Sequence, residues 1–261
     1  MSNDEHQEYD DDLIDVLETI WGEGFLSPGG VDEVDAFLVG MDLSARSVLD
    51  IGCGTGGVDV HLASKHDVKH VTGIDVEAGL VSRCRSLAQK NGLQSVLDFR
   101  CVEPGPLPFD DSQFDVVISK DSIIHIADKA ALSRDIFRVL NPGGWFVASD
   151  WLCGTDSPTP EMQAYVEAEG LDFGLATVEV YRDAMQAAGF VDIGTTDRNI
   201  WYRERARKER DALAGEHFNK LSSSVGKEFL LHQIDVWDKM IVALDQGQLR
   251  PTHLRGRKPD R

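Results

Sequence analysis

The segment from Ser47 to Gly57 constrains the fold of this chain more than any other feature. An apolar run over 47–51 has the length of a buried strand, and glycines at 52, 54 and 57 follow it directly. Glycines at this spacing permit a tight turn into a helix and let the backbone approach a nucleotide-like ligand closely. Because the spacing also fits a dinucleotide phosphate loop, it predicts a nucleotide-binding α/β fold without fixing the ligand.

Two acids narrow the choice of ligand. Asp50 stands two residues before the first glycine, where its carboxylate would repel a pyrophosphate but suit a ligand with a cationic amino group. Asp75 ends the next apolar run, where it can accept hydrogen bonds from both ribose hydroxyls. S-adenosylmethionine carries such an amino group beside its sulfonium. D-x-G-x-G followed by an acid 25 residues later resembles the class I S-adenosylmethionine-dependent methyltransferases.

Strand and helix signals alternate from residue 47 onward, which predicts a mainly parallel sheet with helices on both faces. The expected strands lie near 47–51, 70–75, 96–101, 114–119, 145–150 and 190–196, with a weaker last strand near 253–258. The expected helices lie near 10–21, 31–39, 57–65, 78–91, 129–139, 161–169 and 177–188, and the Asn-Pro-Gly-Gly run at 141–144 predicts a turn. The resemblance implies a Rossmann-like sheet of seven strands.

Three parts of the chain are expected to have different tasks. Residues 1–46 would form an acidic tail and an N-terminal helical lid, and residues 47–200 the methyltransferase core with a substrate-lid insertion near 151–176. Residues 201–261 would add a pair of long helices over 202–246, separated near 222–224, and the final strand.

Composition excludes several classes of function. The chain has 45 acids and 26 bases, a formal net charge of −19, so nucleic acid is not an expected partner. The four cysteines are scattered and no His/Cys/Asp cluster has ligand spacing, so no metal is expected. No apolar run reaches the length of a membrane span and no signal peptide is evident, which favours the cytoplasm. The sequence does not indicate an oligomeric state.

The crevice beyond the carboxyl ends of the strands is the expected cofactor site. It would collect Asp50, Gly52, Gly54, Asp75, Glu103 and Lys120. The resemblance implies that Val76 also borders the cofactor, that Glu103 accepts a hydrogen bond from the adenine amino group, and that Pro104 packs on the adenine face.

Two further segments narrow the resemblance. Tyr9-Asp10-Asp11-Asp12, Ile20-Trp21-Gly22-Glu23 and Leu26-Ser27-Pro28-Gly29-Gly30 are similar to the phosphoethanolamine N-methyltransferases, as is the loop Lys120-Asp121-Ser122-Ile123-Ile124-His125. The sarcosine and dimethylglycine methyltransferases are similar here too. This resemblance implies that Tyr9 closes over the site and pairs with His125, that Leu26 and Ser27 touch the cofactor, and that Asp121 lies beneath the substrate nitrogen.

These residue types suit methylation of a small amine. An amine attacks the sulfonium methyl only after losing a proton, and a histidine can accept one near neutral pH. A tyrosine hydroxyl bonded to the imidazole would fix its tautomer and shield the site from water. Aromatic rings would favour the methylammonium product.

The expected substrate-anchoring segment departs from the family pattern. The resemblance implies an arginine and tyrosines that hold a phosphate, but here Trp151 replaces a phenol, Tyr165 is kept, Glu169 stands in place of the arginine and Leu171 replaces a second tyrosine. A carboxylate facing a phosphate would be repulsive. We therefore expect a small amine without a phosphate, unless Glu169 faces solvent or an anion anchor comes from Arg182 or Lys258.

Three other readings compete with an N-methyltransferase. A carbon methyltransferase of the sterol or prenyl-diphosphate type would need an acidic base and a large apolar cavity. A non-catalytic member would bind S-adenosylmethionine, or the product S-adenosylhomocysteine, without methyl transfer. An NAD-dependent oxidoreductase is disfavoured by Asp50.

Overall fold

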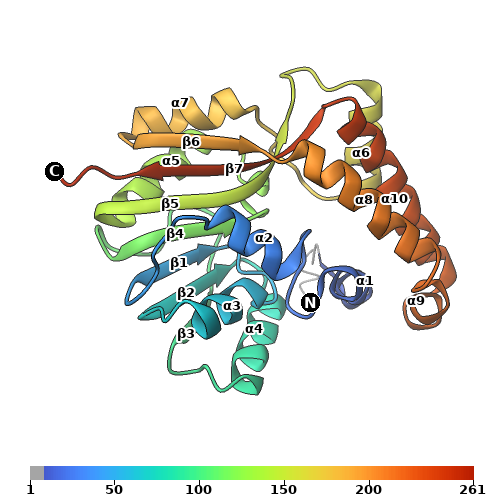
Figure 1. The fold of residues 1–261 in the computed structure, drawn as a ribbon, viewed down its shortest axis with the longest axis horizontal. Coiled ribbons are helices and arrows are strands. Elements are labelled where there is room, and N and C mark those ends of the chain that lie inside the picture. The colour runs from blue at the N-terminus through green and yellow to red at the C-terminus, as the bar shows by residue number, and fades with distance from the viewer. Residues whose placement is uncertain (1–8) are drawn as a thin grey trace, which may run out of the picture.

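A seven-stranded sheet forms the centre of the molecule, in the order β3-β2-β1-β4-β5-β7-β6 (Figure 1). The structure is a computed structural model that describes residues 9–261, so the first half of the predicted acidic tail lies outside the described residues. The strands are β1 (Ser47–Ile51), β2 (His70–Asp75), β3 (Leu97–Cys101), β4 (Phe114–Lys120), β5 (Leu140–Cys153), β6 (Val191–Asp197) and β7 (Leu249–Arg257). Only β7 runs antiparallel to its neighbours, which confirms the predicted mainly parallel sheet.

Helices cover both faces of this sheet because its central strands are apolar on both sides. Val48 packs with α2 (Gly30–Phe37), α3 (Gly57–Lys65) and α4 (Ala78–Lys90), which lie in front of the sheet in Figure 1. The next residue, Leu49, packs on the other side with α5 (Lys129–Val139) and α7 (Val178–Ala188). This alternation is the period of two expected for a strand buried on both faces.

A separate helical layer stands beyond the carboxyl ends of the parallel strands. It consists of α1 (Asp11–Trp21), α6 (Pro160–Glu169), α8 (Asn199–Ala214), α9 (Phe218–Ser224) and α10 (Lys227–Asp245). These helices share a third apolar cluster, and Figure 1 shows them to the right of the sheet, where β1 and β4 end. Because the strand order reverses between β1 and β4, this layer faces the position where ligands bind in open α/β sheets.

The observed elements differ from the predicted ones in three places. The C-terminal region forms three helices rather than the expected pair. The breaks fall at Gly215 and at Gly226, whose φ is +87°. The expected turn at 141–144 is a bulge inside β5, where the register with β4 jumps. The last strand starts at Leu249 rather than near 253, because β7 pairs with β5 as far as Cys153.

No helix within residues 9–261 combines the length and the apolar composition that a membrane crossing requires.

Candidate active site

The glycine turn after β1 has a backbone that only glycine adopts without strain. The φ angles of Gly52, Gly54 and Gly56 are +73°, +56° and +89°. A Cβ on Gly52 would lie 1.6 Å from Ser122 Oγ, in the loop after β4. The turn therefore needs both the positive φ and the missing side chain in order to pack against the β4 loop.

Asp75 braces this turn from the end of β2. Its carboxylate accepts hydrogen bonds from the amides of Gly54 and Glu77, each at 3.0 Å. Burial raises the pKa of Asp75, although these backbone donors oppose the shift. Val76 follows at the exposed edge of the crevice. Each carboxylate oxygen has a further lone pair, so the hydrogen bonds to the backbone leave Asp75 able to accept from ribose hydroxyls.

Asp50 is buried at the end of β1 and faces Asp59 of α3. Burial raises the pKa of Asp50 to about 7, with the nearby Asp75 adding to the shift and Lys120 opposing it. Burial and the neighbouring Asp50 raise the pKa of Asp59 well above its usual range. Two neighbouring buried carboxylates do not both ionise, so the pair carries at most one negative charge, which is available to a cation. Asp50 Oδ1 has no hydrogen-bond partner among residues 9–261.

This crevice fits S-adenosylmethionine. An uncompensated acid suits the cationic amino group, and the braced acid at the end of β2 suits the ribose hydroxyls. Glu103 and Pro104 lie in the exposed loop after β3, at the same edge of the sheet. Their contacts with adenine stay predictions.

Lys120 fastens the N-terminal segment onto the end of β4. Its ammonium donates to Ser27 Oγ at 2.6 Å, Pro28 O at 2.9 Å and Asp121 Oδ2 at 2.9 Å. All three protons are thus directed to protein acceptors, so Lys120 holds the loop rather than presenting a free cation. Leu26, in the same loop, lies over the glycine turn, since a Cβ on Gly54 would be 3.4 Å from Leu26 Cδ1.

A small cavity of about 60 Å³ lies between this loop and the helical layer. All six residues predicted to act in catalysis or substrate binding line it: Tyr9, Asp121, His125, Trp151, Tyr165 and Glu169. Leu26 and Ser27 also line it, which joins the cavity to the glycine turn. No arginine or lysine of the described residues is among its lining residues.

His125 is oriented by a backbone carbonyl. Its Nδ1 lies 2.9 Å from Asp172 O, and its ring packs against Phe173 with the ring centres 5.5 Å apart. Because a carbonyl can only accept, Nδ1 carries a proton, and the neutral ring then keeps its lone pair on Nε2. The histidine is therefore in the tautomer that can accept a proton through Nε2.

Two buried charged residues, which the sequence did not point to as functional, hold the turn that carries His125. Asp150 accepts a hydrogen bond from the Ile124 amide at 3.1 Å, and the Tyr181 hydroxyl donates to the same carboxylate. Lys129 donates to the carbonyl of Ile123 at 2.7 Å. Burial raises the pKa of Asp150 to about 7. The only signal in the sequence was the position of Asp150 at the end of an apolar strand, where an acid is unusual.

Aromatic side chains from α8 and α10 complete the cavity wall. The rings of Trp151 and Tyr202 meet edge to face with centres 5.0 Å apart, and those of Trp21 and Trp237 lie 5.8 Å apart. Tyr202 and Trp237 were not predicted as site residues, because nothing in their local sequence indicates which helix face meets the β4 loop.

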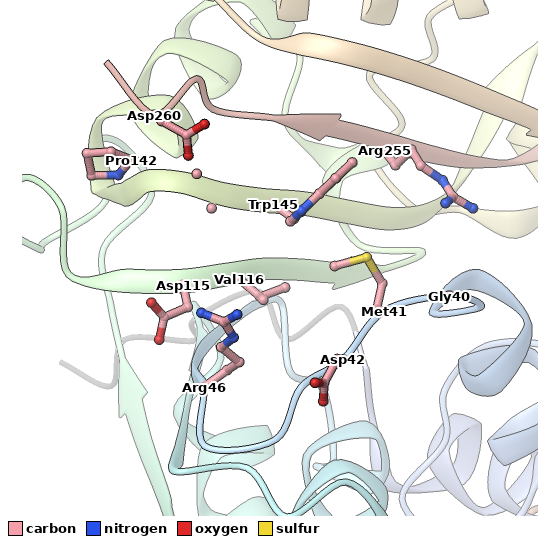
Figure 2. A pocket seen from close by; sticks show the side chains of 12 residues that line it. Gly40, Met41, Asp42, Arg46, Asp115, Val116, Pro142, Trp145, Arg255 and Asp260 are labelled. Atoms are coloured by element: carbon pink, nitrogen blue, oxygen red, sulfur yellow. The ribbon is translucent and has the colours of Figure 1, made fainter.

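A larger hollow of about 520 Å³ lies at the opposite edge of the sheet, where the strands begin (Figure 2). Arg46, Asp115 and Asp260 line it among others, and Figure 2 shows these side chains around the start of β5. Asp115 already accepts from the Ser47 amide at 2.9 Å. Since ligands of open α/β sheets bind at the carboxyl ends, this hollow is not the cofactor site.

Among residues 9–261, one group of possible metal ligands occurs, and it lies away from the cavity. The ligand atoms of Asp35 on α2, His61 on α3 and His66, which follows α3, all lie within 4.8 Å of one another. Asp35 already contacts His61 Nε2 at 2.9 Å and pairs with Lys65. Since none of these residues lines the cavity, the group has no part in the site described above.

Comparison with known proteins places this site in a family. A model of the methyltransferase domain matches residues 49–148. The phosphoethanolamine N-methyltransferase of Triticum aestivum is 37% identical over 234 residues, which cover 89% of this chain and 45% of that protein. The phosphoethanolamine N-methyltransferase of Plasmodium falciparum is 28% identical over 98% of this chain and 91% of its own length. The chain thus spans less than half the length of the plant relatives it matches.

Solved structures share the fold. Phosphoethanolamine N-methyltransferase 2 of Haemonchus contortus, solved with phosphomonomethylethanolamine and S-adenosylhomocysteine, has a TM-score of 0.87 at 24% identity, covering 97% of this chain and 59% of that one. A putative sarcosine dimethylglycine methyltransferase from Galdieria sulphuraria has a TM-score of 0.82 at 19% identity, covering 96% and 98%. The glycine turn, its two acids and these relatives agree: the chain belongs to the class I S-adenosylmethionine-dependent methyltransferases and is similar to the phosphoethanolamine N-methyltransferases among them.

Proposed function

We propose that this protein transfers a methyl group to the nitrogen of a small amine, with Tyr9, Asp121 and His125 at the reacting end of the cavity. The observation that carries the proposal is the shared cavity, which contacts the cofactor loop through Leu26 and Ser27 and contains a histidine whose Nδ1 lies 2.9 Å from Asp172 O. S-adenosylmethionine supplies, when bound, a methyl group on a sulfonium whose carbon–sulfur bond breaks as the amine bonds to that carbon.

The proton of the amine needs an acceptor within the protein. A protonated amine has no lone pair, so it must release a proton before it can form the new nitrogen–carbon bond. His125 Nε2 is the proposed acceptor, because Nδ1–H is committed to Asp172 O. Tyr9 lines the same cavity from the N-terminal segment, and its proposed task is to hold the imidazole and exclude water.

Asp121 supports the positive charge at the nitrogen. Its two carboxylate oxygens accept from Ser149 Oγ and Lys120 Nζ, each at 2.9 Å, so the side chain is rigid as well as buried. Aromatic faces add an attraction for methylammonium of about 0.5–2 kcal/mol each. Together they favour a cationic amine over a neutral substrate.

The cavity argues against the carbon-methylating reading. A volume of about 60 Å³ holds only about five water-sized groups, whereas a prenyl chain needs several times that space. Solved geranyl diphosphate methyltransferases share the fold at 14–16% identity. A likeness of the fold at this identity is no evidence that this chain methylates the same substrate.

Transfer of label from S-adenosylmethionine to ethanolamine, dimethylglycine, phosphoethanolamine and geranyl diphosphate tests the proposal. Label in any of the amines, lost in the His125→Gln variant, is the expected result. Label only in geranyl diphosphate would establish the carbon-methylating alternative. Cofactor binding without label in any acceptor would favour a non-catalytic member.

A further inference from the structure

We infer that Glu169 selects an amine whose far end carries a second positive charge and rejects amines that end in a phosphate or carboxylate. This inference rests on the proposed function and concerns the part of the cavity that Glu169 lines. It depends on which side chains line that end and on how they are paired.

Glu169 lies at the C-terminal end of α6 and its side chain lines the cavity. No hydrogen bond or ion pair to its carboxylate occurs among residues 9–261. Burial raises the pKa of this carboxyl to about 7, the sign of an acid held away from water without a compensating cation. The residue as a whole is half-buried, but its place in the cavity lining argues against a side chain that points only to solvent.

The groups around Glu169 are neutral and include unpaired polar atoms. Tyr165 is 3% exposed, lines the cavity, and its hydroxyl has no hydrogen bond to any other described residue. Tyr202 donates to Glu209 at 3.2 Å, and Gln233 of α10 is buried without a hydrogen bond from its amide to the described part of the chain. The indole nitrogen of Trp21 is likewise unpaired but uncharged. The Tyr165 hydroxyl oxygen and the Gln233 amide oxygen can accept hydrogen bonds from a ligand cation, whereas the Trp21 indole can only donate.

An anion has no charged partner at this end. No arginine or lysine of residues 9–261 lines the cavity, and the two alternative anchors lie elsewhere. Arg182 is exposed on α7, and Lys258 donates to the carbonyls of Phe137 and Leu140 at 2.8 and 2.7 Å. On entering the cavity a phosphate would lose its hydrating water and lie near the unpaired carboxylate of Glu169, which is strongly unfavourable.

The charge pattern of the whole cavity has one consistent interpretation. Asp121 supports the nitrogen that is methylated, and Glu169 pairs with the second cation, while aromatic rings line the same cavity. The small volume restricts the separation of the two charges to a short chain of carbon atoms. A short diamine has this form.

The test compares three amines under the same conditions at pH 8, where Glu169 is ionised: trimethylenediamine, butylamine and phosphoethanolamine. The first two have the same number of non-hydrogen atoms and differ in the charge at the far end. We expect kcat/KM for the diamine to exceed that for butylamine at least about 10-fold, and that for phosphoethanolamine at least about 100-fold. The Glu169→Gln variant should lower the diamine-to-butylamine ratio about 10-fold, whereas Glu167→Gln, exposed on the same helix, should not change it.

The outcomes separate this inference from the proposed function. Turnover of phosphoethanolamine or butylamine as well as the diamine, or a ratio unchanged in Glu169→Gln, would overturn the role of Glu169 while leaving N-methylation standing. Absence of methyl transfer to every amine, with cofactor binding intact, would overturn the proposed function and this inference with it.

Discussion

The two halves of the site are built in different ways. The cofactor half comes from one short run of the chain, β1 with its glycine turn, together with the acid that ends β2. The substrate half comes from the N-terminal segment, the β4 loop and helices α6, α8 and α10, which are far apart in the sequence. In the first half the backbone geometry restricts which residues can be present; in the second, side-chain type and charge decide what binds.

Because of this difference, residue roles inferred from a family resemblance apply more safely to the cofactor half than to the substrate half. A substitution in the glycine turn would disrupt the crevice itself, because Gly52 requires both its positive φ and its missing side chain. A substitution such as glutamate for arginine on α6 leaves the helix intact and changes only the ligand. The four predictions that follow probe this contrast, beginning with the largest expected effect.

Gly52→Ala should abolish cofactor binding. The new methyl group would overlap Ser122 Oγ at 1.6 Å, and alanine is strained at a φ of +73°. We expect affinity for S-adenosylhomocysteine, measured by calorimetry, to fall more than about 100-fold, and the free energy of unfolding to fall by about 3 kcal/mol.

Gly92→Ala is the matched control, since its φ is +70° but nothing lies within 4 Å of the added carbon. That variant should lose only about 1 kcal/mol of stability and bind normally. Equal binding losses in the two variants would show that backbone strain, not the packing of the turn, is responsible.

His125→Gln should stop chemistry while leaving cofactor binding unchanged. Glutamine can donate to Asp172 O, but it cannot accept a proton from the amine. Loss of a positioned base costs about 10²–10⁴-fold in kcat, measured with saturating amine and cofactor. His232→Gln, exposed on α10, controls for loss of an imidazole elsewhere. A kcat within a few-fold of the wild-type value would transfer the proton-accepting task to another group.

Much of the fold, including the glycine turn and the strands on either side of it, could be predicted from the sequence because those signals are local. The strands at 47–51 and 70–75 and the helix at 57–65 were placed to the residue, since an apolar run and a glycine turn are contiguous. The helix break at Gly226 was misplaced because serines near 222–224 looked like a loop, although Ser222 and Ser223 donate to the Asn219 carbonyl and stay helical.

The substrate half could be predicted only in part. Tyr165 and Glu169 came from the resemblance, and their placement around one cavity needed the structure. Tyr202, Gln233 and Trp237 carried no local signal, because the face of a helix that meets the site depends on how β7 pairs with β5 and how α10 packs on α6 and α8. Tertiary packing decided these contacts.

Tyr181→Phe should lower both stability and kcat, by smaller amounts. The lost hydroxyl leaves buried Asp150 with fewer donors and loosens the turn that carries His125. The expected cost is about 1–3 kcal/mol, measured by urea unfolding. Because the pKa of Asp150 in the folded protein is about 7, the carboxyl is neutral at pH 5 and ionised at pH 8, so the cost should be greater at pH 8. We expect kcat to fall while the KM for cofactor stays unchanged, which separates positioning of His125 from damage to the glycine turn. An identical cost at both pH values would exclude a role for the ionised carboxylate.

Glu169→Gln should increase stability, which makes the substrate half the opposite of the cofactor half. A carboxyl whose pKa rises from about 4.3 in the unfolded chain to about 7 in the folded protein binds more protons when folded between those values. Stability is therefore lost as pH rises through that window, and the full cost is present above pH 7. Glutamine does not ionise, so the variant should be more stable than the wild type at pH 8 by about 1 kcal/mol, with solvent in the cavity limiting the gain. The gain should vanish at pH 4. Glu167→Gln, exposed on the opposite side of α6 from Glu169, should show no gain at either pH. A destabilised Glu169→Gln variant would mean that the carboxylate has a partner in the free protein. A stabilised one would mean that the cavity keeps an unpaired charge at the expense of the fold, which is reasonable only if a ligand cation pairs with it.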